Sequence, residues 1–181
     1  MKLSRKIGFI LVLSTVGLGI WVTPHIDWQI LFSKGNSALC PFCRPSAVLD
    51  RSVFYEGPHS LGLITYKPAA EGHVLVIPKR HVMRFEELED VELIDMKQTI
   101  QRIDQASQKL YDSTSYLLFQ KNGKAAGQSV PHVHFHYIPR KEGESLLALV
   151  IRISTVALFK PMSWDEVERH KEIMSQYMQA L

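Results

Sequence analysis

Residues 131–140 read PHVHFHYIPR, a stretch in which every second side chain from position 132 to 136 is a histidine and the residues between are apolar. The three histidines are His132, His134 and His136. Successive side chains of a β-strand point to opposite faces of a sheet, so a strand over Val130–Ile138 would place the three imidazoles on one face. Chance rarely produces such a row. The stretch therefore predicts a sheet that carries a functional site.

Imidazoles on one strand face support two kinds of chemistry. Three of them could ligate zinc together and form a zinc hydrolase site. Alternatively, a neutral imidazole can attack phosphorus and form a covalent intermediate, provided that its neighbours fix its tautomer. Gln128 and Ser129, just before the histidines, can donate hydrogen bonds to phosphate oxygens. The residues alone leave both interpretations open.

The flanking sequence predicts an α+β fold built on an antiparallel sheet. A periodic apolar pattern between Arg84 and Asp112 predicts a long helix, and Ser163 begins a C-terminal helix with a capping-box pattern. The apolar segment Leu146–Phe159 fits a strand or a buried turn of helix. For the whole segment Lys141–Phe159 core packing is the preferred interpretation, and the alternatives are that it lines the leaving-group side or covers a dimer surface. Four further runs are typical of strands: Ser52–Tyr55, Leu61–Tyr66, His73–Ile77 and Ser115–Gln120.

Size and charge limit the classes of function. The chain has 181 residues, of which 46% are hydrophobic, so one domain with a real core and an appendage can form. The formal net charge is +3, and three basic residues stand among the first six positions. The rest of the chain therefore has no clear basic excess, and we expect no nucleic-acid partner.

The N-terminus has the pattern of a membrane-directed segment. Residues 1–6 read MKLSRK, and residues 7–22 form an uncharged apolar run. We divide the chain into a signal anchor or signal peptide (1–32), expected to form an apolar helix, a small polar linker (33–39) and a catalytic domain (40–181). An uncleaved anchor is favoured. It would hold the domain at the membrane outside the cytoplasm, whereas cleavage would release a secreted or periplasmic protein.

The only two cysteines, Cys40 and Cys43, form a CPFC pair at the start of the domain. Their spacing fits a redox pair, half of a zinc site or two unrelated thiols. Spacing alone does not choose among these.

Two segments together resemble the histidine-triad (HIT) superfamily. One is GQSVPHVHFHYIPR (127–140), and the other is GHVLVIPKRHV (72–82), with a predicted helix between them as in that family. The resemblance covers about 100 residues, from Cys40 to Arg140. It implies a HIT-like fold and an enzyme that cleaves nucleoside 5′-phosphoryl bonds through a nucleotidyl-histidine intermediate.

The resemblance also implies roles for single residues. His134 would be the nucleophile, and His136 would bind and polarise the phosphate. The other implied contacts are made by side chains around these two: His132 as a buttress or metal ligand, His73 near the phosphate or the triad, Gln128 at the leaving-group oxygen and Ser129 at a phosphate oxygen. Thr65 stands where the family usually has an acidic residue or Asn for the ribose, and Lys121 stands where Asn or Gln is frequent. These two departures leave the nucleoside preference open.

The resemblance further implies a structural zinc ion held by two thiolates and two imidazoles, because many bacterial members carry such a set. The corresponding residues are Cys40, Cys43, His81 and His132. A Cys40–Cys43 disulfide is the main rival in an oxidising compartment. No organic cofactor is expected.

Two substrate classes compete within the expected activity. HVHFHYIPRKEGE (132–144) and VMRFEEL (82–88) resemble the dinucleoside-polyphosphate hydrolase branch, which is slightly favoured. The CPFC start and IPKRH resemble the phosphoramidate-hydrolase branch. A membrane-tethered nucleotide-binding protein with little turnover is the alternative from another class. The family also implies a two-fold homodimer.

Overall fold

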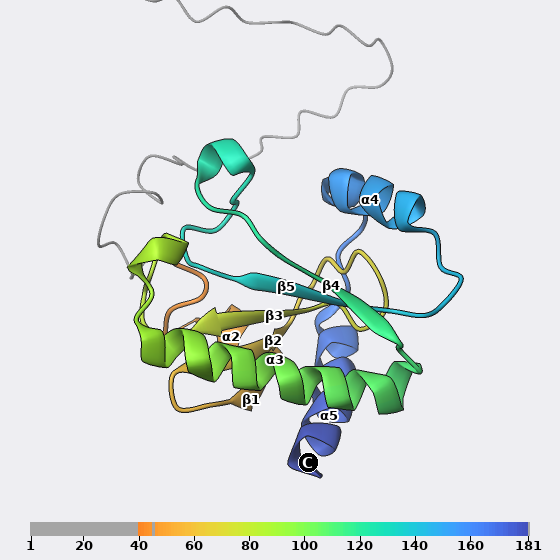
Figure 1. Ribbon diagram of the computed structural model, residues 1–181, viewed down its shortest axis with the longest axis horizontal. Helices are drawn as coiled ribbons and strands as arrows, with labels where there is room; N and C mark the ends of the chain where they lie inside the picture. Colours follow the sequence, from red (N-terminus) through yellow and green to blue (C-terminus); the bar gives the residue numbers. More distant parts are fainter. Residues whose placement is uncertain (1–39, 45, 181) are drawn as a thin grey trace, which may run out of the picture.

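A five-stranded antiparallel sheet forms the centre of the computed structural model, which describes residues 40–44 and 46–180 (Figure 1). The strand order is β1-β2-β3-β5-β4. The strands are β1 (Val53–Glu56), β2 (Ser60–Ile64), β3 (Val74–Pro78), β4 (Ser115–Gln120) and β5 (Phe135–Arg140). The expected antiparallel α+β fold is therefore present, and it places β3 and β5, which follow or carry histidines, side by side.

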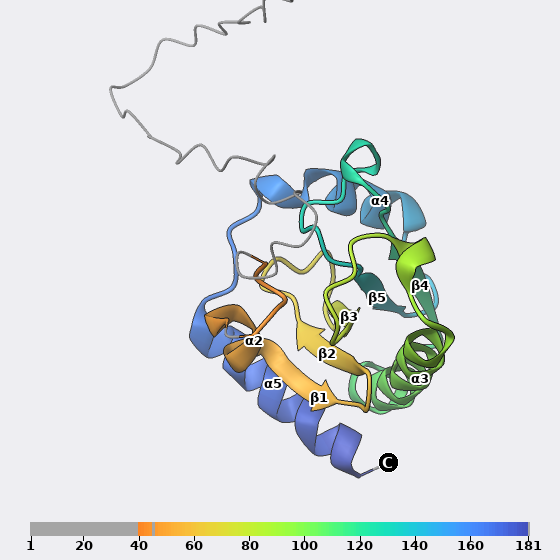
Figure 2. The same ribbon diagram turned by 90° about the vertical axis from the view of Figure 1, so that its left-hand side faces the viewer.

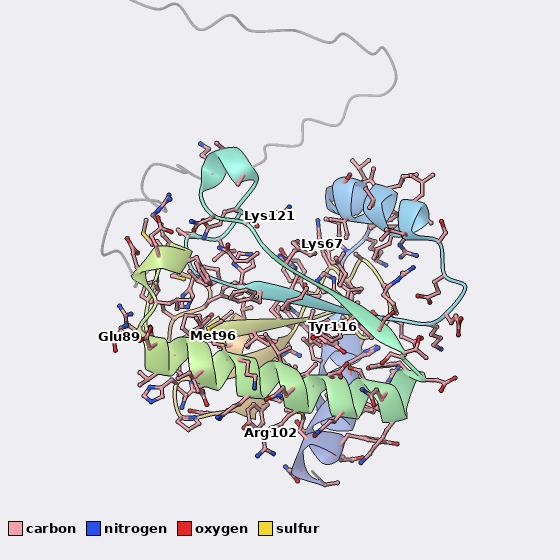
Figure 3. All side chains as sticks on the ribbon, in the orientation of Figure 1. Lys67, Glu89, Met96, Arg102, Tyr116 and Lys121 are labelled. Atoms are coloured by element: carbon pink, nitrogen blue, oxygen red, sulfur yellow. The ribbon has the colours of Figure 1, made fainter. Side chains whose placement is uncertain are left out.

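Two helices cover one face of the sheet: α3 (Asp90–Tyr111) and α5 (Trp164–Gln179) (Figures 1 and 2). Met96 on α3 and Met174 on α5 are buried with Val76 and Tyr137 of the sheet, and Figure 3 shows Met96 on the sheet side of its helix. Ser163 accepts a hydrogen bond from the Glu166 backbone, as the capping-box pattern predicted. This layer is the main core of the domain.

The opposite face of the sheet is covered in two halves. The short helix α2 (Ala47–Ser52) and the segment from Cys40 to Phe42 pack over β2 and β3. Helix α4 (Leu146–Thr155) reaches the other half through Leu149, which is buried with Ala69 and Ile138. Between these two covers lies the part of β5 that carries His136.

The predicted strands agree with the observed ones to within a few residues, and β4 has the predicted bounds. The helix expected over 84–112 is shorter, because a 3-10 turn, η2 (Phe85–Glu87), precedes α3. The α3 helix begins with a capping box between Glu89 and Glu92. Three elements were not predicted: α2, η3 (Lys124–Ala126) and η4 (Val156–Leu158).

The expectation of core packing for 146–159 is wrong. The segment is helical, and Leu149 is its one buried residue in α4. Leu147 is 70% exposed and Leu158 84% exposed. The segment is an apolar helix of which only a narrow side contacts the sheet. A sequence pattern does not distinguish such a helix from one that is buried in the core.

The strand expected over 130–138 is also different. The β5 strand begins at Phe135, so His132 and His134 lie in the irregular segment before it. The three imidazoles consequently do not share one strand face. The expected N-terminal apolar helix and linker fall outside the described residues. Within the part of the chain that is described, none of the helices combines the length and the apolarity needed to cross a bilayer.

Candidate functional site: two histidine clusters from one segment

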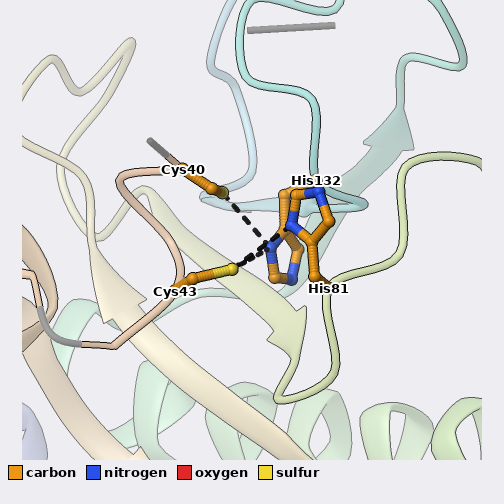
Figure 4. A group of neighbouring side chains, drawn as sticks. All are labelled: Cys40, Cys43, His81 and His132. Carbon is orange, nitrogen blue, oxygen red and sulfur yellow. Dashed lines mark hydrogen bonds between the residues drawn. The ribbon is translucent and has the colours of Figure 1, made fainter. Parts of the chain in front are cut away.

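The His132 side chain lies beside the cysteine pair and His81 (Figure 4). Its Nδ1 lies 3.5 Å from Cys40 Sγ and 3.7 Å from Cys43 Sγ. The His81 Nδ1 lies 3.2 Å from Cys43 Sγ. The four predicted metal ligands are thus brought together, with one ligand atom of each within 4.8 Å of the others.

The donor set fits a tetrahedral metal. With metal–sulfur and metal–nitrogen bonds of about 2.3 and 2.0–2.1 Å, sulfur and nitrogen in a zinc tetrahedron are about 3.6 Å apart. The three S···N distances given above bracket that value. His132 Nε2 donates to the Pro78 carbonyl oxygen at 2.9 Å, which leaves Nδ1 as the free lone pair. The four residues could therefore hold a metal ion.

The two cysteines are not joined to each other, and both are free thiols in the structure. Burial raises the pKa of the Cys40 thiol to about 12 and raises the pKa of Cys43 as well. A thiol in such surroundings ionises when a cation supplies the compensating charge. The pair therefore fits a metal site better than a redox site, whose reactive cysteine needs a lowered pKa.

The hydrogen bond of His134 fixes which of its ring nitrogens carries the proton. Its Nδ1 donates to the carbonyl oxygen of His132 at 2.7 Å. A carbonyl accepts but cannot donate, so the neutral ring carries its proton on Nδ1 and its lone pair on Nε2. The side chain is 4% exposed. The backbone of the metal-cluster residue thus fixes the tautomer of the next histidine.

His136 is fixed from the opposite direction by a chain of hydrogen bonds. The Ala69 backbone N–H donates to His73 Nδ1 at 3.0 Å, so His73 carries its proton on Nε2. That nitrogen lies 2.9 Å from His136 Nδ1 and donates to it. The neutral His136 ring therefore carries its own proton on Nε2. His136 therefore carries an N–H donor at Nε2, and His134 carries a lone pair at Nε2. The centroids of the two rings are 5.0 Å apart.

Burial keeps these rings neutral. It lowers the pKa of His73 to about 4 and that of His136 to about 2, and it also lowers the pKa of His134. The charge of Lys121 further lowers the pKa of His134 and His136, which places this predicted residue within electrostatic reach of both. A neutral imidazole is the form that can attack phosphorus.

Two aromatic side chains that the sequence analysis did not single out line the histidines. Phe119 on β4 stacks on His136 with ring centroids 4.5 Å apart and an interplanar angle of 9°. Phe42 meets His134 edge-on at 5.6 Å. Phe119 could have been found from the alternation of β4, whereas Phe42 lies between the cysteines and carries no pattern of its own.

Gln128 is buried and holds the glycine-bearing loop against the histidine segment. Its Oε1 accepts from the Gly123 backbone N–H at 2.7 Å, and its Nε2 donates to the carbonyl oxygens of Met83 at 3.0 Å and His132 at 3.3 Å. Gly123 has a φ of 93°, a conformation that favours glycine. Its Nε2 thus donates twice inside the protein, and the predicted contact to the leaving-group oxygen stays a prediction.

The remaining predicted binding residues are placed less closely. Ser129 is exposed beside Gln128, and Thr65 is buried immediately after β2. Their predicted contacts to a phosphate oxygen and to the ribose stay predictions.

The chain belongs to the HIT domain family, whose model matches residues 46–143, more than half of the chain. The sheet, the paired histidines and the ligand cluster described above all lie within or beside that range. The curated proteins that it resembles include nucleotide hydrolases and an uncharacterized HIT-like protein.

Three curated relatives illustrate the range. An uncharacterized HIT-like protein of Methanocaldococcus jannaschii is 39% identical over 108 residues, which cover 59% of this chain and 82% of the relative. A bifunctional bis(5′-adenosyl)-triphosphatase/adenylylsulfatase of Arabidopsis thaliana is 38% identical over 55% of this chain and 56% of its own. The adenosine 5′-monophosphoramidase of Saccharomyces cerevisiae is 36% identical, over 60% of this chain and 66% of its own.

Solved structures agree with the fold. A zinc-bound histidine triad family protein from Mycobacterium smegmatis superimposes with a TM-score of 0.60 at 25% identity, over 80% of this chain and 96% of that one. The C. elegans NitFhit protein superimposes with a TM-score of 0.59 at 31% identity, over 70% of this chain and 27% of that one. The chain spans about half of the Arabidopsis enzyme and much less of the nematode fusion protein.

Proposed function

We propose that this chain hydrolyses nucleoside 5′-phosphoryl bonds through a nucleotidyl intermediate on His134. The observation that carries the proposal is the fixed tautomer pair: a lone pair on His134 Nε2 beside a proton on His136 Nε2. One ring can attack phosphorus while the other donates to a phosphate oxygen. Relatives that hydrolyse dinucleoside polyphosphates or a nucleoside phosphoramidate support the substrate class.

The reaction has two balanced steps. His134 Nε2 attacks the phosphorus, and an N–P bond forms. The bond from phosphorus to the leaving oxygen or nitrogen breaks with its electron pair, and the leaving atom takes up a proton from solvent. The charge on the nucleotidylated ring is stabilised because its Nδ1–H donates to the His132 carbonyl oxygen. Water then attacks phosphorus, the N–P bond breaks, a proton is lost to solvent, and His134 returns to its neutral form. His136 Nε2–H stabilises the phosphoryl oxygens in both steps.

Zinc in the cluster of Cys40, Cys43, His81 and His132 is part of the same proposal. When bound, the ion would serve as a structural cross-link, because four protein ligands leave no open position for substrate. With the metal ligands held in place, the backbone of His132 positions the neighbouring histidine. The imidazole of His132 fixes the position of its backbone carbonyl, and that carbonyl orients His134.

Substrate preference decides between the two subclasses. We propose dinucleoside polyphosphates, with adenosine 5′-phosphoramidate as the competing substrate. Purified protein should be assayed with diadenosine triphosphate, diadenosine tetraphosphate and adenosine 5′-phosphoramidate, and kcat/KM compared. A higher value for the phosphoramidate would assign the chain to the other branch. Nucleotide binding without turnover of any of the three would favour a tethered binding protein.

The intermediate itself can be trapped. A labelled nucleotide analogue, quenched without acid because phosphoramidates are acid-labile, should leave its label on His134 in peptide mapping. A label on another residue, or none in an enzyme that turns over normally, would contradict the proposed nucleophile.

Assembly and location are proposed from the exposed surfaces and the sequence. Tyr116 and Leu118 are partly exposed on the sheet-edge strand β4, which supports a two-fold dimer that joins two sheets. Sedimentation at micromolar concentration should show a dimer.

The basic and apolar residues 1–22 support an anchor with the domain outside the cytoplasm. Protease added to cells from which any wall or outer membrane has been removed should then degrade the domain, and protection by the inner membrane would contradict this location.

A further inference from the structure

The ring of Phe119 lies flat against His136, a contact that the two steps of the proposed reaction do not use. The ring centroids are 4.5 Å apart, and the two planes differ by only 9°. The rings of His73 and His134, in contrast, meet His136 at 48° and 67°. A parallel aromatic ring therefore covers one face of the imidazole whose Nε2–H donates to phosphate in the proposed reaction.

The register of the sheet sets this contact. Phe119 on β4 and His136 on β5 are direct partners in the antiparallel pair, so their side chains project side by side from the same face. Leu117 and Ile138 form the corresponding pair two residues further along, on that same face. The phenyl ring is thus placed on the imidazole by two paired strands and not by a loop.

Helix α4 supports the phenyl ring from outside the sheet. Ala69, Ile138 and Leu149 form a buried apolar cluster, to which α4 contributes Leu149. Phe119 packs against this cluster, and so does Ile153, one turn further along α4. Close packing of this kind leaves a side chain little room to move. Strand and helix side chains together therefore hold the phenyl ring in place.

The two contacts on His136 restrict different movements of its ring. The hydrogen bond from His73 to Nδ1 acts along the ring plane and leaves the opposite edge, with Nε2–H, for a phosphate oxygen. That bond does not fix the tilt of the plane, because the ring can rock about it. A parallel ring at van der Waals distance restricts the tilt, and it offers no acceptor that would compete for the Nε2–H.

We propose that Phe119 is a positioning residue for His136 and holds the plane of the imidazole so that Nε2–H points at the phosphoryl oxygen. Helix α4 contributes by keeping the phenyl ring in place through Leu149 and Ile153. The inference rests on the proposed hydrolysis, in which His136 stabilises the phosphoryl oxygens. A donor of this kind acts most strongly in the transition state, so its misalignment should lower kcat more than it raises KM.

Two variants at position 119 separate the flat ring from mere apolar bulk. Phe119→Leu keeps an apolar side chain without the flat face, and Phe119→Tyr keeps the ring. Phe119→Leu should lower kcat about tenfold with little change in KM, because a small displacement of a catalytic group is costly. Phe119→Tyr should retain most of the parent activity. Equal kcat values in the two variants would overturn the proposal.

A double-mutant cycle tests whether the effect passes through His136. In the His136→Ala background the ring to be positioned is gone, so Phe119→Leu should have almost no further effect on kcat. Losses that multiply as independent effects would mean that Phe119 acts in another way, and the proposal would be wrong. Urea unfolding of each variant ensures that kcat values are compared on folded protein.

The contribution of α4 has a matched pair of isoleucines. Ile153 is half-buried against the apolar cluster, whereas Ile151 is exposed. Ile153→Ala should lower kcat in the same way as Phe119→Leu but by a smaller factor, and Ile151→Ala should leave kcat unchanged. Equal effects of the two substitutions would contradict the role given to α4.

A spectroscopic measurement tests the positioning without turnover. In carbon–proton correlation spectra of protein with labelled histidines, the ring protons of His136 should lie upfield, because the ring stacks on Phe119. The signals should move downfield and broaden in Phe119→Leu and stay upfield in Phe119→Tyr. Identical signals in the parent and Phe119→Leu would overturn the proposal. If the signals change as expected but the parent hydrolyses no nucleotide, the proposed function fails and the orienting contact stands.

Discussion

His132 and His134 are two residues apart, yet they serve two different environments. The His132 ring faces two thiols and another imidazole. Its Nε2 donates to a carbonyl oxygen, so its Nδ1 has the lone pair that a metal can bind. The His134 ring is directed towards His136, and its carbonyl-bonded Nδ1 leaves a lone pair for phosphorus. In both cases a backbone carbonyl fixes the tautomer, so that the free lone pair faces the metal-ligand cluster in His132 and is left for the proposed attack on phosphorus in His134.

This difference teaches that the two clusters are coupled by backbone rather than by shared side chains. The His132 carbonyl accepts from both His134 Nδ1 and Gln128 Nε2. Substitutions in the metal cluster should therefore lower activity by displacing the His132 carbonyl and with it the His134 ring. Substitutions of His134 or His136 should leave the metal bound.

The largest effect should come from His134→Ala. Removing the attacking atom should lower kcat by roughly 10⁴-fold or more, as deletion of a nucleophile does in other enzymes. Metal content should change little, because the ring is not a ligand. Steady-state kinetics and elemental analysis measure both.

His136→Ala is the comparison for that variant. It removes a phosphate donor and leaves the nucleophile, so we expect a smaller loss of about 10²- to 10³-fold. Activity close to that of the parent in His134→Ala would show that the nucleophile has been misassigned.

Cys40→Ser should have the next largest effect, on stability. Loss of a metal ligand should release the ion and cost on the order of 4 kcal/mol of unfolding free energy. Urea unfolding with elemental analysis would measure this. The control is the same substitution measured in chelator-treated protein, where the difference should nearly vanish. A parent protein that is metal-free and equally stable would refute the ligand set.

Gln128→Ala should have a moderate effect. It leaves the Gly123 N–H and the Met83 carbonyl without this partner, and the His132 carbonyl keeps only its bond from His134. The loss should cost about 1–3 kcal/mol of stability. Turnover should fall by the same factor for substrates with good and poor leaving groups, because the side chain positions the loop. A loss confined to poor leaving groups would instead show that Gln128 reaches the leaving group.

A further effect concerns the pH dependence of stability. Burial lowers the pKa of His73 from its ordinary value of 6.5 to about 4. As the pH falls, the His73 ring is therefore protonated in the unfolded chain before it is protonated in the folded protein. Stability contributed by His73 is present above pH 6.5 and should decline by up to about 1.4 kcal/mol per pH unit between 6.5 and 4. Urea unfolding at pH 7 and 5 should show a shallower dependence in His73→Gln than in the parent. An identical dependence would mean that His73 is protonated alike in both states.

Local periodicity determined much of this molecule. The alternation of short apolar runs gave the strands, and the three- and four-residue spacing gave α3, because both patterns follow from backbone geometry. The chemistry-bearing residues were likewise visible, since histidines at 132, 134 and 136 and the cysteines at 40 and 43 are distinctive in any fold. The sequence alone thus determined which residues matter and the class of fold that carries them.

Tertiary structure decided how those residues are divided. Strand β5 begins only at Phe135, so the alternation expected from the sequence does not hold for His132, and its ring meets cysteines 92 and 89 positions away. The proton positions on His73 and His136 depend on the Ala69 backbone, which no pattern reveals. The exposure of α4 depends on how much of the sheet was already covered. Each of these is a long-range contact, and the spacing of residues along a chain carries no information about which distant backbone will meet it.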